Sequence, residues 1–111
     1  MDLIRLLLQK TEGEEPKPDL SRYTIEQQLY HYVLMEEAGL IVARFVQGNE
    51  GEVVSAIVER LTNAGHDFLE ASRSDTIWYK FKQSVAKVGG SISVPVAVEL
   101  LKALVRTELG L

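Results

Sequence analysis

The 111-residue chain contains no cysteine, and this absence removes several kinds of site at once. Disulfides, thiolate nucleophiles and cysteine-based metal centres all need the missing side chain. The chain also lacks any apolar run near the roughly 18 residues that a membrane-spanning helix needs. The short apolar stretch at the N-terminus is interrupted by Arg5, and no small-residue cleavage site comes after it. We therefore expect no signal peptide, no membrane partner and a cytoplasmic location.

Positive charge is scarce as well. Twelve Lys and Arg residues stand against sixteen Asp and Glu, which gives a net charge of −4 and no general attraction to nucleic acid. The excess acid lies in residues 1–40, because residues 41–111 carry equal numbers of acidic and basic side chains. The hydrophobic share of 46% and the length predict one soluble domain, or a small domain with an appendage.

The most informative stretch runs from Thr24 to Leu69 and begins with a helix. Thr24 is suited to accept a hydrogen bond from the first turn of a helix over Ile25–Ala38. Gly39 ends that helix, because glycine enters the left-handed cap conformation at little cost. This segment therefore predicts a helix that is sharply bounded at both ends.

Two β-branched runs come next, over Leu40–Gln47 and Glu52–Leu61, and the turn-forming Gly48-Asn49-Glu50-Gly51 joins them. Thr62 can cap a further helix over Asn63–Ser72. A helix followed at once by a β-hairpin is typical of a winged helix-turn-helix.

Within the second run, apolar and polar side chains alternate only loosely. We expect Val53, Ile57 and Leu61 on one side of the strand, with Glu52 and Glu59 on the other. The register of this strand is left open.

Helical spacing predicts three more helices: Asp2–Lys10, a helix from Ser74 or Asp75 to Lys87, and a last one that opens at Ser93 and Pro95. We thus predict an α+β fold with a winged helix-turn-helix-like domain in residues 1–72. Residues 73–111 would form a helical pair that packs on this domain or builds a dimer interface.

Three segments carry a resemblance to a known family: Met1–Arg5, the Tyr30–Ile41 segment YHYVLMEEAGLI, and Leu61–Leu69 with its GHDFL sequence, followed by Trp78. Together they resemble the bacterial and phage family catalogued as domain of unknown function twenty-five thirteen. Val33 and Met35 depart from the leucines usual in that family. The resemblance implies a winged-helix-like domain often encoded on mobile genetic elements, and it implies no activity.

Two functions compete for the helix over Ile25–Ala38. It offers an acidic surface for a basic protein partner, which is the function we expect, through Glu26, Gln27, Tyr30, Glu36 and Glu37. The alternative is a DNA-binding transcriptional regulator. Its candidate contacts are Arg22, Gln27, Gln28, Tyr30, Arg44 and Arg60. The helix has no Lys or Arg, and its carboxylates would repel phosphates, so the sequence disfavours DNA.

Self-association is a further hypothesis. The last two predicted helices have broad apolar faces, and the candidate interface residues are Trp78, Phe81, Val85, Leu101 and Val105. The alternative, which the sequence leaves open, is that these residues pack against one another within one chain.

No enzyme, metal or cofactor is expected. His31 and His66, with Asp67 and Glu70, could in principle ligate a metal, but no metal-binding spacing joins the two histidines. More ordinarily, both histidines would form hydrogen bonds with a backbone or carboxylate atom. Gly65 is interpreted as a point where the ribbon approaches the helix closely.

Overall fold

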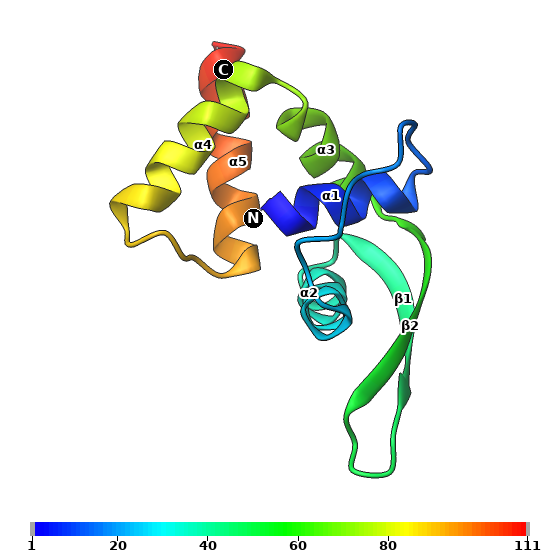
Figure 1. Cartoon of the computed structure of the whole chain (residues 1–111). Coiled ribbons are helices and arrows are strands. Elements are labelled where there is room, and N and C mark those ends of the chain that lie inside the picture. The colour runs from blue at the N-terminus through cyan, green and yellow to red at the C-terminus, as the bar shows by residue number, and fades with distance from the viewer. Residues whose placement is uncertain (1, 111) are drawn as a thin grey trace. The chain divides into compact units, whose positions relative to one another are not determined.

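The computed structural model describes residues 2–110 and shows five helices and one two-stranded antiparallel sheet, a mixed α+β fold (Figure 1). In chain order the elements are α1 (Asp2–Thr11), α2 (Ile25–Glu37), β1 (Ile41–Gln47), β2 (Val53–Leu61), α3 (Asn63–Ser72), α4 (Asp75–Lys87) and α5 (Val94–Glu108). No helix in this described part is long and apolar enough to cross a bilayer.

The chain divides into two compact units, residues 1–66 and 67–111. The sequence places a boundary at the end of α3, after Ser72, and the compact units divide within the same helix. Helix α3 therefore contributes residues to both units.

The core of the first unit forms where α1, α2 and the base of the ribbon meet. Helix α1 buries one stripe at the spacing expected from its sequence, and α2 contributes two residues to the same core. The buried side chains are Leu3, Ile4, Leu7 and Leu8 of α1, Tyr32 and Met35 of α2, and Leu40, Ile41 and Leu61 at the ribbon base. Burial of this apolar surface, rather than local propensity, holds the short α1 in place.

The ribbon forms the predicted hairpin, but the side predicted for Ile57 is wrong. Ile57 is 46% exposed and lies opposite Arg44, whereas Leu61 is buried. Two β-bulges explain the difference, because register shifts leave Val54 and Glu59 as extra residues on β2. Each extra residue moves the residues after it to the other face of the strand, so a spacing of four no longer keeps side chains on one side.

Hydrogen bonds hold the start of β1 and the end of β2 to the helices beside them. Gly39 has φ +76°, and the Gly39 and Leu40 amides donate to Glu36 and Met35 carbonyls, which closes α2 as predicted. The Thr62 hydroxyl donates to Gly39 O (2.5 Å) and accepts from Gly65 N (3.0 Å). The predicted cap of α3 therefore also ties that helix to the end of α2.

Gly65 is a point of close approach between α3 and the segment before β1. A Cβ atom at this position would lie 2.0 Å from the Leu40 carbonyl oxygen and 3.2 Å from the Leu61 Cβ. The interpretation of Gly65 as a close-approach glycine is thus confirmed.

The second unit is organised around an aromatic cluster. Trp78 and Phe81 of α4 stack with ring centroids 5.0 Å apart, and Phe68 of α3 meets both rings edge-on. Helix α5 adds Val94, Ala97 and Leu101 to the buried set, and Lys80 of α4 pairs with Glu108 of α5. Of the two residues considered for the start of α4, Ser74 is the cap and accepts from Ile77 N, and at the start of α5 Ser93 accepts from Val96 N.

Candidate interaction surface on helix α2

The N-terminus of α2 is fixed by a reciprocal pair of hydrogen bonds. Thr24 Oγ1 accepts from Gln27 N at 3.0 Å, and Gln27 Oε1 accepts from Thr24 N at 2.8 Å. This capping box results from the Thr-x-x-Gln pattern of residues 24–27, a signal that is visible in the sequence. The Gln27 side chain is therefore used within the chain, although it was a candidate for both functions.

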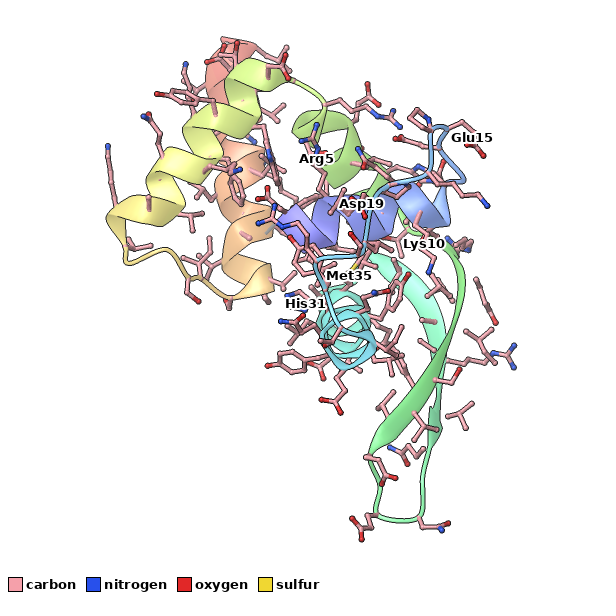
Figure 2. All side chains as sticks on the ribbon, in the orientation of Figure 1. Arg5, Lys10, Glu15, Asp19, His31 and Met35 are labelled. Atoms are coloured by element: carbon pink, nitrogen blue, oxygen red, sulfur yellow. The ribbon has the colours of Figure 1, made fainter. Side chains whose placement is uncertain are left out.

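Burial of Tyr32 and Met35 decides which side of α2 faces solvent. At about 100° per residue, the opposite side carries positions 26, 30, 33 and 37. Met35 points from α2 toward α1 (Figure 2). Glu26, Tyr30 and Glu37 are accordingly exposed, Tyr30 to 62%. Glu36 lies nearer the buried side but is also exposed. We call Glu26, Tyr30, Glu36 and Glu37 the acidic surface of α2.

Among the residues that the structure describes, the carboxylates of this surface have no cationic partner. Within residues 2–110, Glu26, Glu36 and Glu37 form none of the ion pairs, and α2 has no basic residue in its last turn. Glu26 sits in the first turn, where the helix dipole favours negative charge, but Glu36 and Glu37 lie at the end where it is disfavoured. The last turn of α2 is therefore electrostatically suboptimal for stability.

One aromatic side chain lies within the acidic surface. The Tyr30 ring meets the His31 ring edge-on, with centroids 5.9 Å apart. His31 Nδ1 lies 2.8 Å from the Gln27 carbonyl oxygen, so the backbone of the preceding turn holds the imidazole. The exposed face of Tyr30 can accept an arginine or lysine side chain by a cation–π contact.

On the buried side, Tyr32 connects α2 to the end of α1. Burial raises the pKa of the Tyr32 hydroxyl above its ordinary value of 10.0, and a hydrogen bond with the Thr11 side chain opposes this shift in part. Thr11 in turn donates to the Leu7 carbonyl at 2.9 Å. This chain of hydrogen bonds fixes the orientation of α2, and hence of the acidic surface.

Most side chains proposed to contact DNA have intramolecular partners. Arg44 Nε lies 2.9 Å from Glu59 Oε1 across the ribbon. Arg60 Nη1 donates to the Leu61 carbonyl at 3.1 Å, and Gln28 Nε2 donates to the Tyr23 carbonyl at 3.3 Å. Arg22 is exposed in the loop before α2. The pairing of Arg44 with Glu59 depends on the ribbon register, which the sequence left open.

The residues proposed for self-association lie mostly in the core of the second unit. Trp78, Phe81, Val85 and Leu101 are 8% exposed or less, and Val105 is half-buried. Four of these five side chains are thus buried within a single chain.

Neither histidine belongs to a metal-binding group. Among residues 2–110 no three His, Cys, Asp or Glu side chains converge as metal ligands would. His66 Nε2 lies 3.8 Å from Glu12 Oε1, and Glu70 pairs with Arg73 at 2.9 Å. Both histidines have the ordinary partners expected for them, a backbone carbonyl for His31 and a carboxylate for His66.

Comparison with known proteins assigns the chain to a family. The model of a family described as "Hypothetical protein (DUF2513)" matches residues 1–91, which include α1 to α4 and the ribbon. The chain belongs to this family. The resemblance inferred from the three sequence segments is thereby confirmed, and α5 of this DUF2513 protein lies beyond the matched part.

A relative from Haemophilus influenzae, named "Uncharacterized protein", is 30% identical to this DUF2513 protein over 112 residues. The match covers 96% of this chain and 90% of the relative. No solved structure matches the chain.

Proposed function

We propose that this DUF2513 protein is a non-catalytic regulatory module that binds a basic protein segment through the acidic surface of α2. The observation that carries the proposal is a helix face with exposed, unpaired carboxylates around an exposed tyrosine. A partner that places arginine or lysine over Tyr30, close to Glu26 and Glu37, would gain both ion pairs and a cation–π contact.

The order and packing of the elements support a winged-helix-like architecture for the first unit. Helix α2 precedes the ribbon and packs against both of its strands, as the helix before the wing does in such domains. We propose the regulatory role, in a phage or mobile-element context, from this architecture together with the family resemblance.

Electrostatics argue against DNA as the ligand. A winged helix that binds DNA presents donors from the helix before the wing and from the wing itself. Here that helix has no Lys or Arg, and the wing tip carries Glu50 and Glu52. The helix and the wing tip, which would both approach the phosphates of DNA, therefore carry negative charge.

The test is a pair of fluorescence-anisotropy titrations at low and moderate salt. One uses a labelled arginine-rich helical peptide, and the other uses mixed genomic DNA duplexes. We expect the peptide to bind with an affinity that falls as salt rises, and the duplexes not to bind at low salt, where attraction is greatest.

A charge-reversal variant locates the binding surface. Glu26→Lys with Glu37→Lys should weaken peptide binding at least tenfold, whereas Glu15→Lys with Glu99→Lys, the same two changes at exposed positions outside α2, gives the control for net charge. Equal losses in both variants would mean attraction by overall charge and would refute the α2 surface. Salt-sensitive duplex binding would instead favour the DNA-binding regulator.

A further inference from the structure

The outer face of the ribbon, which points away from α2, carries exposed apolar side chains. Ala43, Phe45, Ala56 and Val58 on the inner face are half-buried, whereas Val46 and Ile57 on the outer face are each 46% exposed. Val54, the extra residue of the bulge near the tip, is 50% exposed. The ribbon extends beyond α2 (Figure 1), and no third strand pairs with it within residues 2–110. Three exposed β-branched side chains on one narrow hairpin form an apolar patch.

The charges around this patch are arranged from one end of the ribbon to the other. Arg44 and Arg60 lie toward its base, and only Glu59 balances them there. Glu50 and Glu52 lie at the tip, where the Glu52 carboxylate accepts from Glu50 N at 3.0 Å. The outer face of the ribbon therefore changes from basic and apolar side chains near the base to acidic side chains at the tip.

Such an arrangement is complementary to itself when one copy is turned end to end. We propose that the outer faces of two ribbons pack antiparallel around a two-fold axis near Val46, so that the partner is a second copy of this chain. With this axis, Arg44 and its cross-strand neighbour Ile57 face the Glu52 level of the second copy, Arg60 faces its Glu50, and the two Val46 side chains meet at the axis. A two-fold contact repeats each ion pair, as isologous interfaces do.

The size of the ribbon sets the strength of this contact. Seven residue pairs span about 24 Å at ~3.4 Å per residue, and two strands are about 10 Å wide, so each copy covers on the order of 240 Å². Stable interfaces bury roughly 1,200 Å² or more in total, and the dimer should therefore be weak and salt-sensitive.

The first experiment is sedimentation equilibrium of the full chain from about 10 μM to 1 mM at low salt, a range set by this expected weakness. We expect a reversible monomer–dimer equilibrium that Val46→Lys weakens at least tenfold. Val96→Lys is the matched control, because Val96 is also about half exposed (54%) but lies on α5. A chain that stays monomeric throughout, or a dimer that Val46→Lys leaves intact, would overturn the proposal.

The second experiment separates this arrangement from any other apolar contact. Arg60→Glu and Glu50→Lys each place like charges opposite one another in a homodimer, so each variant alone should stay monomeric. Mixed together they restore opposite charges at both contacts, and a heterodimer should appear by native mass spectrometry. Absence of the heterodimer, with both variants folded by circular dichroism, would refute the antiparallel register.

Discussion

At the scale of single residues, burial of the Tyr32 hydroxyl makes the free energy of unfolding depend on pH. The residue is 8% exposed, and burial raises the pKa of the hydroxyl above 10.0. The folded state therefore holds the proton more tightly than the unfolded chain does. Stability from this effect is fully present below pH 10 and is lost as pH rises beyond it, because only the unfolded chain ionises readily there.

Replacement of Tyr32 by phenylalanine should remove this alkaline sensitivity. At neutral pH, Tyr32→Phe should cost about 1 kcal/mol through the lost hydrogen bond with Thr11. Between pH 9 and 11 the free energy of unfolding should fall more steeply for the wild-type chain than for the variant. Urea unfolding at several pH values measures both slopes, and parallel curves would contradict the assignment to Tyr32.

Substitution of Gly65 shows whether helix propensity or a tertiary contact determines which residue is most stable at this position of α3. In an open helix, Gly→Ala should stabilise by about 0.5–1 kcal/mol. Here the new Cβ would lie 2.0 Å from the Leu40 carbonyl oxygen, which is backbone and cannot rotate away. We expect Gly65→Ala to destabilise by about 2 kcal/mol or more, measured by denaturant unfolding, so that a more stable variant would refute the close approach.

At the scale of elements, α2 combines a well-built beginning with a poorly compensated end. Its capping box and its glycine-terminated C-terminus obey local rules, but Glu36 and Glu37 oppose the helix dipole. The unfavourable placement of Glu36 and Glu37 has no compensating contact within the described part of the chain, and such a local violation is expected where side chains serve a binding surface. This placement supports the proposed function without depending on any relative.

Opposite effects are therefore expected from the same substitution at the two ends of α2. Glu36→Lys should raise the free energy of unfolding by about 0.3–1 kcal/mol, while Glu26→Lys should lower it by a similar amount. Both should weaken binding of a basic peptide. Thermal unfolding followed by circular dichroism provides the first measurement, and a loss of stability in Glu36→Lys would contradict the dipole argument.

At the scale of the whole molecule, the two compact units differ in charge as well as in architecture. Residues 1–66 carry eleven acidic and six basic side chains, whereas residues 67–111 carry five and six. Both surfaces proposed for binding belong to the first unit. The lone tryptophan, Trp78, is buried among Phe68 and Phe81 of the second unit and gives an optical probe of that unit alone.

Local sequence was enough to predict the elements. Helix ends and the hairpin turn depend on residues close in the chain, such as Thr24 with Gln27 and Gly39 with Met35, so short-range hydrogen bonding encodes them. The family, too, was inferred correctly from short segments, and GHDFL contains the Gly65 that the packing demands.

Tertiary structure alone decided which side chains are exposed and paired. The face of Ile57 depends on two bulges that cross-strand pairing creates, and the pairing of Arg44 with Glu59 results from that register. Whether Trp78 and Phe81 face a core or solvent depends on helices that are distant in sequence. Local patterns fix where elements begin and end, but exposure is set by contacts between elements, which no single segment contains.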